Sequence, residues 1–316
     1  MSTRPESFEA DPSPHDSRLS ALMSQRRRLI NIAYRLLGSF ADAEDAVQET
    51  FTRWYALSRQ QQEEIASPGA WLSTVVSRVC LDQLRSARAQ REQYVGEWLP
   101  EPVPDAAEWS DGREPGTADP ADRITLDESI NMAFLVILDS MTPAERVAFL
   151  LHDVFRYPFA EVAEVVGRTP AACRQLASSA RRRVEAAQPV ETPTAQRAGV
   201  VRGFKQAWEA KDIGALVDLL DPTAVAVADG GGLVSASLEP IEGGERVARY
   251  FVDLAERIGS LELLERTVNG QAGLVAVHQG ETAAVYAFEI AGDQIRRVWV
   301  VRNPDKLRQW TDLRRR

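Results

Sequence analysis

Residues 142–184 read TPAERVAFLLHDVFRYPFAEVAEVVGRTPAACRQLASSARRRV, and this stretch decides the fold around it. Thr142 can cap a helix with Pro143 at its first position, because proline's missing N–H is not needed there. Glu145, three residues after the cap, completes the pattern of a capping box. The sequence therefore predicts a helix that begins at Pro143.

Two further helices follow within the same stretch. Apolar residues recur at helical spacing over 159–166, and Gly167 ends that helix because glycine accepts a left-handed conformation. Thr169 and Pro170 open the next helix by the same cap-then-proline pattern. Its apolar face comprises Cys173, Leu176, Ala177, Ala180 and Val184. Its outward residues are Arg168, Arg174, Gln175, Ser178, Ser179, Arg181 and Arg182.

The second helix of this pair is strongly basic on its free side, and the first acid after its start is Glu185. A helix–turn–helix with such a face fits the major groove of DNA. A solvated charged helix in an ordinary bundle is the alternative interpretation.

Residues 26–90 also have the pattern of a helical bundle. One helix buries Val47, Phe51, Trp54 and Tyr55 and has a polar, acidic opposite face. The next begins at Ser67-Pro68, buries Trp71, Val75, Val79 and Leu84, and runs into an arginine-rich end. Two differently charged faces in one bundle indicate two partners, one a protein and one a polyanion.

These segments resemble the bacterial sigma-70-type factors. DAEDAVQETFTRWY (42–55) is similar to their core-polymerase-binding helix, and WLSTVVSRVCLDQLR (71–85) is similar to the helix that reads the −10 element. Residues 158–184 resemble their −35-reading domain. The arrangement without intermediate regions resembles the extracytoplasmic-function group, and the match covers about residues 20–186.

The resemblance implies roles for individual residues. Asp45, Gln48, Glu49 and Thr52 would face core polymerase. The −10 element would be contacted by Trp71, Arg78, Asp82 and Arg85. The −35 element would be contacted by Thr169, Arg174, Gln175, Ser178, Arg181 and Arg182, with Arg181 to Arg183 on phosphates.

Charge is unevenly distributed along the chain. The formal charge of −9 would count against a free-standing DNA-binding protein, but a sigma factor shares the DNA with polymerase. Residues 97–123 hold eight acids against two arginines and five prolines, which predicts an extended or disordered tether. This tether is either a passive linker or an acidic shield for the basic faces beside it.

No cofactor is expected. Cys80 and Cys173 each lie on an apolar helical face, and three scattered histidines provide no metal-ligand spacing. The sequence shows no signal peptide and no apolar run near the ~20 residues that a membrane helix needs. We therefore expect a cytoplasmic protein without a membrane partner.

The C-terminal third changes to an α+β pattern. Amphipathic helices at about 200–208, 213–220 and 246–258 precede short strands within 274–302, and a strand candidate lies at 225–227. This order resembles the SnoaL-like, ketosteroid-isomerase-like cone fold. Such a fold encloses a pocket, so a small-molecule ligand is a further expected partner.

A catalytic site in that cone would need an acid–base pair. The candidates are Asp229, Tyr286, His278 and Glu289, and the sequence gives no geometry that links them. Three strings instead resemble motifs of the sigma-factor subgroup with a fused SnoaL-like domain, the SigJ type, in which that domain modulates sigma activity. They are Trp98-Leu99-Pro100-Glu101-Pro102, Asp229-Gly230-Gly231-Gly232 and Asn303-Pro304-Asp305-Lys306-Leu307. Leu233 stands where the subgroup commonly has a basic residue. The alternative is a purely structural role, as turn glycines and a C-terminal cap.

The sequence thus predicts a non-enzymatic alternative sigma factor, with RNA polymerase core and promoter DNA as partners. Its competitors are a SnoaL-like isomerase or hydrolase fused to a DNA-binding module, and a one-component repressor. The predicted division is a disordered N-terminus (1–17), sigma domain 2 (18–95), an acidic linker (96–125), sigma domain 4 (126–187), a hinge (188–196) and a SnoaL-like regulatory domain (197–316). The expected fold class is mainly α, followed by the α+β domain.

Overall fold

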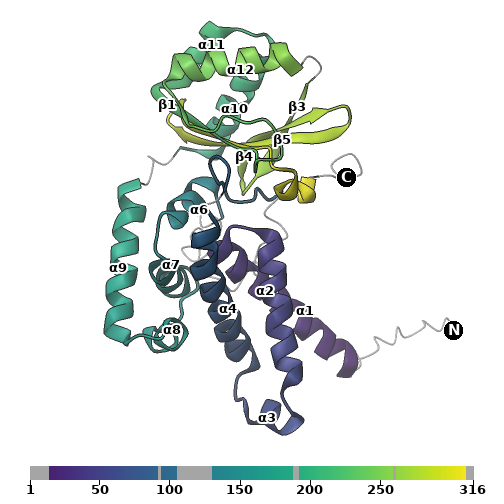
Figure 1. Cartoon of the computed structure of the whole chain (residues 1–316), viewed down its shortest axis with the longest axis vertical. Coiled ribbons are helices and arrows are strands. Elements are labelled where there is room, and N and C mark those ends of the chain that lie inside the picture. The colour runs from purple at the N-terminus through teal and green to yellow at the C-terminus, as the bar shows by residue number, and fades with distance from the viewer. Residues whose placement is uncertain (1–13, 92–93, 105–129, 188–191, 259–260, 311–316) are drawn as a thin grey trace, which may run out of the picture.

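The computed structural model describes residues 14–91, 94–104, 130–187, 192–258 and 261–310. Two helical regions lie below a C-terminal α+β domain (Figure 1). The first helical region comprises α1 (Pro14–Leu37), α2 (Phe40–Ala56), α3 (Arg59–Glu64) and α4 (Pro68–Arg91). The second comprises α6 (Met132–Asp139), α7 (Pro143–Phe149), a π-helical turn (Leu150–Val154), α8 (Phe159–Val166) and α9 (Pro170–Ala187).

Side-chain caps set several helix starts, and the one at α7 was predicted from the sequence. Thr142 and Glu145 form the capping box of α7, and a second box joins Ser58 and Gln61 at α3. Gly167 ends α8 in the left-handed conformation with φ of 72°, which is strained for any residue with a Cβ.

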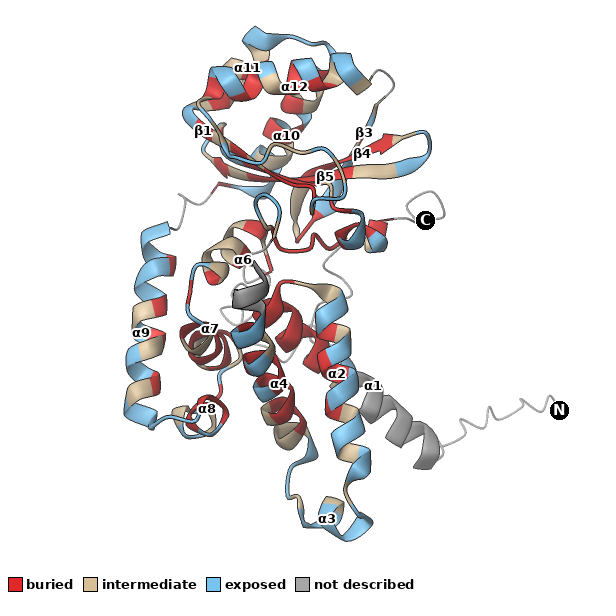
Figure 2. Ribbon diagram, in the orientation of Figure 1, coloured by how far each residue is buried: buried red, intermediate tan, exposed pale blue. Residues whose placement is uncertain are grey.

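The two helical regions share one hydrophobic core, which runs from Leu29 to Val184. Helix α4 packs against α7 and α8 as well as against α1 and α2, and Figure 2 shows the buried surfaces of these helices turned toward one another. Arg146 of α7 donates to the Leu36 carbonyl of α1 over 2.9 Å. The two regions are therefore in direct contact rather than separated by a tether.

The C-terminal domain is a six-stranded sheet with helices on one face. Its helices are α10 (Thr194–Glu209), α11 (Ile213–Leu219) and α12 (Gly244–Ile258). Its strands are β1 (Leu220–Asp229), β2 (Ile241–Glu242), β3 (Glu262–Val268), β4 (Gln271–His278), β5 (Glu281–Ala291) and β6 (Gln294–Val301). The strand order is β2-β1-β6-β5-β4-β3, and only the β1–β6 pair among these strands is parallel.

The two faces of this sheet have different partners. One face packs on α10–α12 around Phe204, Trp208, Phe251 and Tyr286. The other face packs on Leu99 and Met132, which belong to the segment after α4 and to α6. The sheet is thus buried on both sides, once within its own domain and once against the helical regions.

Several expectations need correction. Helix α1 begins at Pro14 rather than after residue 17, because proline suits a first helical turn; residues 1–13 lie outside the described residues. Residues 194–196 are helical rather than part of a hinge. Tyr55 is 63% exposed, because the buried face of α2 includes Thr50 rather than Tyr55. The sequence interpretation also missed β3, whose polar side chains hide its alternation.

A further correction concerns the predicted tether. Residues 99–103 are buried, not extended in solvent, since the connecting segment (residues 94–104) lies between the first helical region and the sheet. The rest of the predicted tether, 105–125, lies outside the described residues, so the shielding hypothesis stays a prediction.

Candidate nucleic-acid and polymerase interfaces

Helix α9 presents the basic face that the sequence predicts. Arg174, Gln175, Ser178 and Arg182 are exposed, while Cys173, Ala177 and Ala180 are buried against α7 and α8. Thr169 caps the helix, because its hydroxyl accepts the Ala172 N–H over 3.2 Å. In Figure 1 this helix lies at the outer left edge of the molecule.

Some of these side chains have partners within the chain. The Arg174 guanidinium lies 5.5 Å from the centre of the Phe159 ring, and Arg181 pairs with Asp153, with Nε 2.9 Å from the carboxylate. Ser179 was expected to face outward. In the structure its hydroxyl donates to Glu145 over 3.0 Å. Although burial opposes it, the hydrogen bonds from Thr142 and Ser179 lower the pKa of Glu145.

The face of α4 that was expected to meet the −10 element lies beside α8. Arg78 is exposed, yet its Nη2 donates to the Glu164 carbonyl of α8 over 3.0 Å. Arg85 and Asp82 are exposed and pair with each other at 3.2 Å. Trp71 is half-buried against Trp54, with ring centres 5.2 Å apart.

The predicted polymerase-facing side of α2 is open to solvent. Asp45, Gln48, Glu49 and Thr52 are all exposed, on the side away from buried Ala43, Ala46 and Val47. Glu49 pairs with Arg53 at 2.5 Å one turn along the helix. The four residues are thus accessible to a partner, and their role at core polymerase stays a prediction.

The three motif strings of the sequence meet in one network around Asp229, the last residue of β1. Asp229 is fully buried, and its carboxylate accepts four hydrogen bonds, each from a different donor. The donors are the Tyr94 hydroxyl (2.6 Å), the Leu99 N–H (2.9 Å), the Gly231 N–H (3.0 Å) and Lys306 Nζ (2.6 Å). We call this set the Asp229 network. Burial, together with the hydrogen bond to Asp229, raises the pKa of Tyr94.

Lys306 is the cation of this network and pairs with the Asp229 carboxylate. Its Nζ also donates to the Leu99 carbonyl over 2.6 Å and lies 4.2 Å from the centre of the Trp98 ring. Leu307 is buried in the sheet's outer cluster, whereas Pro304 is exposed and Asp305 pairs with Arg308 at 2.5 Å. The motif string therefore contributes through Asn303, Lys306 and Leu307.

The glycines of the 229–232 loop permit close approach. A Cβ on Gly231, whose φ is 63°, would overlap the Asn303 carboxamide. Gly230 is buried with its backbone against Val234, and Gly232 faces Val95. Asn303 donates to the Tyr94 hydroxyl over 2.9 Å. Leu233 is 63% exposed, so the departure at that position leaves an apolar side chain in solvent.

Several contact residues were missed by the sequence interpretation. Asn269, in the turn between β3 and β4, exchanges hydrogen bonds with the Val103 backbone and donates to the Ile130 carbonyl over 2.9 Å. Trp310 Nε1 donates to the Pro102 carbonyl over 2.8 Å. Asn269-Gly270 has the pattern of an ordinary turn, and nothing in the sequence indicates that Asn269 is buried.

Glu101 ties the connecting segment to α2. Its carboxylate accepts the Phe40 N–H over 2.7 Å, and its backbone N–H donates to the Gly38 carbonyl over 2.7 Å. Burial raises the pKa of Glu101 to about 7, although the N–H groups of Phe40 and Ala41 oppose the rise. Pro100 is buried beside Gly38.

Comparison with known proteins identifies the family. The family model for Sigma-70 region 2 matches residues 22–90, and that for Sigma-70, region 4 matches residues 131–184. The chain is 38% identical over 305 residues to the ECF RNA polymerase sigma factor SigJ of Mycobacterium tuberculosis, covering 91% of this chain and 92% of that protein. This protein is an extracytoplasmic-function sigma factor. It is also 34% identical to a probable ECF RNA polymerase sigma factor SigI of M. tuberculosis, over 93% of this chain and 96% of that one.

The fold of the whole sigma factor has a solved counterpart. The crystal structure of M. tuberculosis SigJ matches with a TM-score of 0.72 at 34% identity, covering 92% of this chain and 98% of that chain. The C-terminal domain of this sigma factor is accordingly SnoaL-like. As a sigma factor it acts with RNA polymerase core at promoter DNA.

The four candidate catalytic residues of this sigma factor lie in different surroundings. Tyr286 is buried among aromatic rings on the helix side of the sheet, where burial raises its pKa. Asp229 belongs to the network described above, and Glu289 lies 3.6 Å from Arg297 on the opposite face. The structure therefore does not assemble these groups with His278 into one site.

Two further expectations concern membranes and metals. Across the described residues, no helix is long and apolar enough to cross a membrane. Both Cys80 and Cys173 are buried free thiols, as small apolar residues in a core commonly are.

Proposed function

We propose that the SnoaL-like domain of this sigma factor restrains its promoter-binding regions in a closed arrangement and so lowers its activity. The observation that carries the proposal is the Asp229 network. It fastens the connecting segment, which leaves region 2, to the C-terminal domain. Because Asn269 binds both this segment and Ile130 at the start of region 4, the same domain holds both regions.

The closed arrangement is incompatible with simultaneous reading of both promoter elements. Elements centred at −35 and −10 are roughly 25 base pairs apart, which is about 85 Å of B-form DNA. In the structure Arg78 of α4 hydrogen-bonds to Glu164 of α8. The two regions must separate before α4 and α9 can reach their elements together.

Burial makes the restraint effective. Asp229 is fully buried and Lys306 is 8% exposed. Both belong to the C-terminal domain and would stay paired on opening, but they would be exposed and would lose their hydrogen bonds to Tyr94 and Leu99. A hydrogen bond to a charged group contributes about 1.5–3 kcal/mol. Polymerase or another partner must supply that free energy.

The individual roles follow the sequence prediction. In the open state α2 presents Asp45 and Glu49 to core polymerase, and α4 turns Arg78, Asp82 and Arg85 to the melted −10 strand. Helix α9 reads the −35 bases with Arg174, Gln175 and Ser178. Arg182 contacts phosphate there, and Arg181 does so once it leaves Asp153. The SnoaL-like domain acts by contact rather than by catalysis, since its candidate acid–base groups lie apart.

The test uses a variant that loosens the contact without touching either promoter-binding face. Asn269→Ala with Trp310→Phe removes the hydrogen bonds of both side chains, each worth about 0.5–1.5 kcal/mol. The matched control is Arg249→Ala, which removes an exposed pair with Glu245 on the same domain. Fluorophores on cysteines introduced at Glu63 and Glu185 report the separation of the two regions. The labels attach selectively at these positions, because the native thiols are buried.

We expect the double variant to show lower energy transfer and higher run-off transcription at limiting sigma factor. The Arg249→Ala control should match the wild type in both measurements. Unchanged energy transfer and transcription in the double variant, or a fall in transcription, would contradict the proposal.

A further inference from the structure

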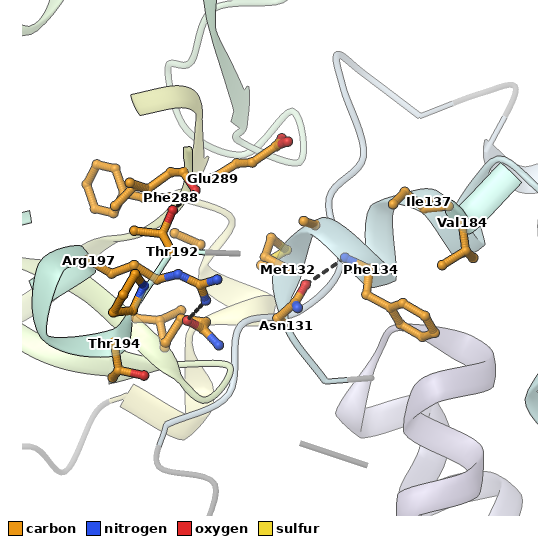
Figure 3. A pocket seen from close by; sticks show the side chains of 16 residues that line it. Asn131, Met132, Phe134, Ile137, Val184, Thr192, Thr194, Arg197, Phe288 and Glu289 are labelled. Carbon is orange, nitrogen blue, oxygen red and sulfur yellow. Dashed lines mark hydrogen bonds between the residues drawn. The ribbon is translucent and has the colours of Figure 1, made fainter. Parts of the chain in front are cut away.

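A cleft of about 550 Å³ lies between region 4 and the outer face of the SnoaL-like sheet. Figure 3 shows Asn131, Met132 and Phe134 on one side of it and Thr192, Arg197 and Phe288 on the other. Its volume is within the range of small-molecule sites, about 300–1,000 Å³.

The interior of the cone, by contrast, is filled by the protein's own rings. Trp208 packs against Phe251 and Tyr286 with ring centres 4.9 and 5.3 Å away, and Phe204 lies 5.4 Å from Phe288. Trp208 and Tyr286 are each 1% exposed. A ligand of this domain is therefore better accommodated at the junction than inside the cone.

The lining of the cleft combines apolar side chains with polar groups and includes one cation, Arg197. Met132, Ile137 and Val184 contribute apolar surface from region 4. Arg197 enters from α10, and its Nη1 donates to Gln271 over 2.5 Å. Its Nε is buried and has no hydrogen-bond partner among the described residues. An unpaired buried donor of this kind costs free energy that an acceptor on a ligand would recover.

The carboxylate in the lining does not offset this cation. Glu289 is already paired with Arg297, 3.6 Å away, and burial raises the pKa of Glu289. Two other polar lining residues have partners within the chain: the Asn131 side chain accepts the Phe134 N–H, and the Thr192 hydroxyl bonds to the backbone of Ile290 and Gly292. Arg197 is thus the group that would select a ligand by charge.

We propose that this cleft binds a small amphipathic anion, an aromatic or aliphatic body with one carboxylate-like oxyanion that accepts from Arg197. The inference rests on the proposed function, because the walls come from both domains and the cleft exists only in the closed arrangement. A ligand there favours the closed arrangement, since it contacts both walls only in that state.

The probe is 8-anilinonaphthalene-1-sulfonate, which carries an apolar body and one oxyanion, compared with the uncharged N-phenyl-1-naphthylamine. Arg197→Gln removes the cation. The matched control is Arg202→Gln on the same helix, where the exposed Arg202 side chain pairs with Glu265 at 3.3 Å. Fluorescence titration of the full chain gives the dissociation constants.

We expect saturable one-site binding of the sulfonate to the wild type. Arg197→Gln should raise its dissociation constant by about tenfold or more, as for loss of a charge-assisted hydrogen bond. Binding of the uncharged probe should be unchanged, and Arg202→Gln should match the wild type with both probes. Equal effects of the two substitutions would overturn the site.

Energy transfer between the Glu63 and Glu185 labels distinguishes failure of the cleft site from failure of the proposed closed arrangement. High transfer without saturable sulfonate binding would overturn the cleft site and leave the closed arrangement standing. Low energy transfer in the unliganded wild type would contradict both the closed arrangement and the cleft site.

Discussion

Asn269 Nδ2 donates a 2.9 Å hydrogen bond to the hydroxyl of Tyr34, and this contact joins the C-terminal domain to the first helix of region 2. The Tyr34 hydroxyl donates in turn to the Glu101 carbonyl over 2.7 Å. Tyr34 is fully buried, and burial raises its pKa. A single phenol therefore links region 2, the connecting segment and the SnoaL-like domain.

Removal of that hydroxyl should destabilise the closed chain. Tyr34→Phe leaves the Glu101 carbonyl without this donor and one N–H of the Asn269 amide without this acceptor, in a buried site. We expect a loss of about 1–3 kcal/mol in the free energy of unfolding, measured by urea denaturation. Tyr55→Phe is the matched control, because Tyr55 is 63% exposed. Equal stabilities of the two variants would show that the Tyr34 contacts contribute little.

Glu101 should give the closed chain a pH dependence. Its pKa is about 7 in the folded chain against 4.5 for an ordinary glutamate, so the folded state binds more protons between these values. The free energy of unfolding contributed by Glu101 must then fall as pH rises from about 4.5 to 7, by at most about 3 kcal/mol.

Glu101→Gln removes this titration while keeping an acceptor for the Phe40 N–H. Relative to the wild type, the variant should gain stability as pH rises through that window. Chemical denaturation at pH 5, 6, 7 and 8 gives the comparison. A difference between the two proteins that stays constant with pH would refute the assignment to Glu101.

The exposed acids of α2 should be required for polymerase binding. Asp45→Lys with Glu49→Lys places positive charge where negative charge is predicted to face the partner. Like-charge contacts cost several kcal/mol, so we expect affinity for core polymerase to fall by about a hundredfold or more.

The control is Glu245→Lys on α12, an exposed acid remote from this face. Co-purification and titration with core polymerase report binding, and circular dichroism checks that both variants are folded. Undiminished core binding by the folded α2 variant would exclude this face.

The sequence predicted those features whose causes are local. The capping box of Thr142 and Glu145 and the left-handed Gly167 depend on neighbours a few residues away. The polar face of α2 and the basic face of α9 follow from helical periodicity, which survives packing. The motif strings that meet at Asp229 came from a family resemblance, and the structure shows the contacts between them.

Other features depend on contacts between segments far apart in the chain. Leu99 to Val103 looked like a proline-rich tether, because no local pattern shows that a sheet edge and Trp310 will cover them. Tyr55 fits an apolar stripe in the sequence but is 63% exposed in the structure. Asn269 looks like a turn residue, and its role follows from Tyr34, 235 positions away.

Two arginines of α9 should separate base reading from phosphate binding. A good bidentate base contact is worth about 1–3 kcal/mol of discrimination, whereas loss of a phosphate contact weakens all sequences alike. Arg174 lies near the start of α9 over Phe159, and Arg182 is exposed near its end. Arg174→Ala should therefore relax the −35 preference, and Arg182→Ala should lower transcription from every promoter by a similar factor. Run-off transcription over a library of −35 sequences measures both, and proportional losses in the two variants would contradict this division of roles.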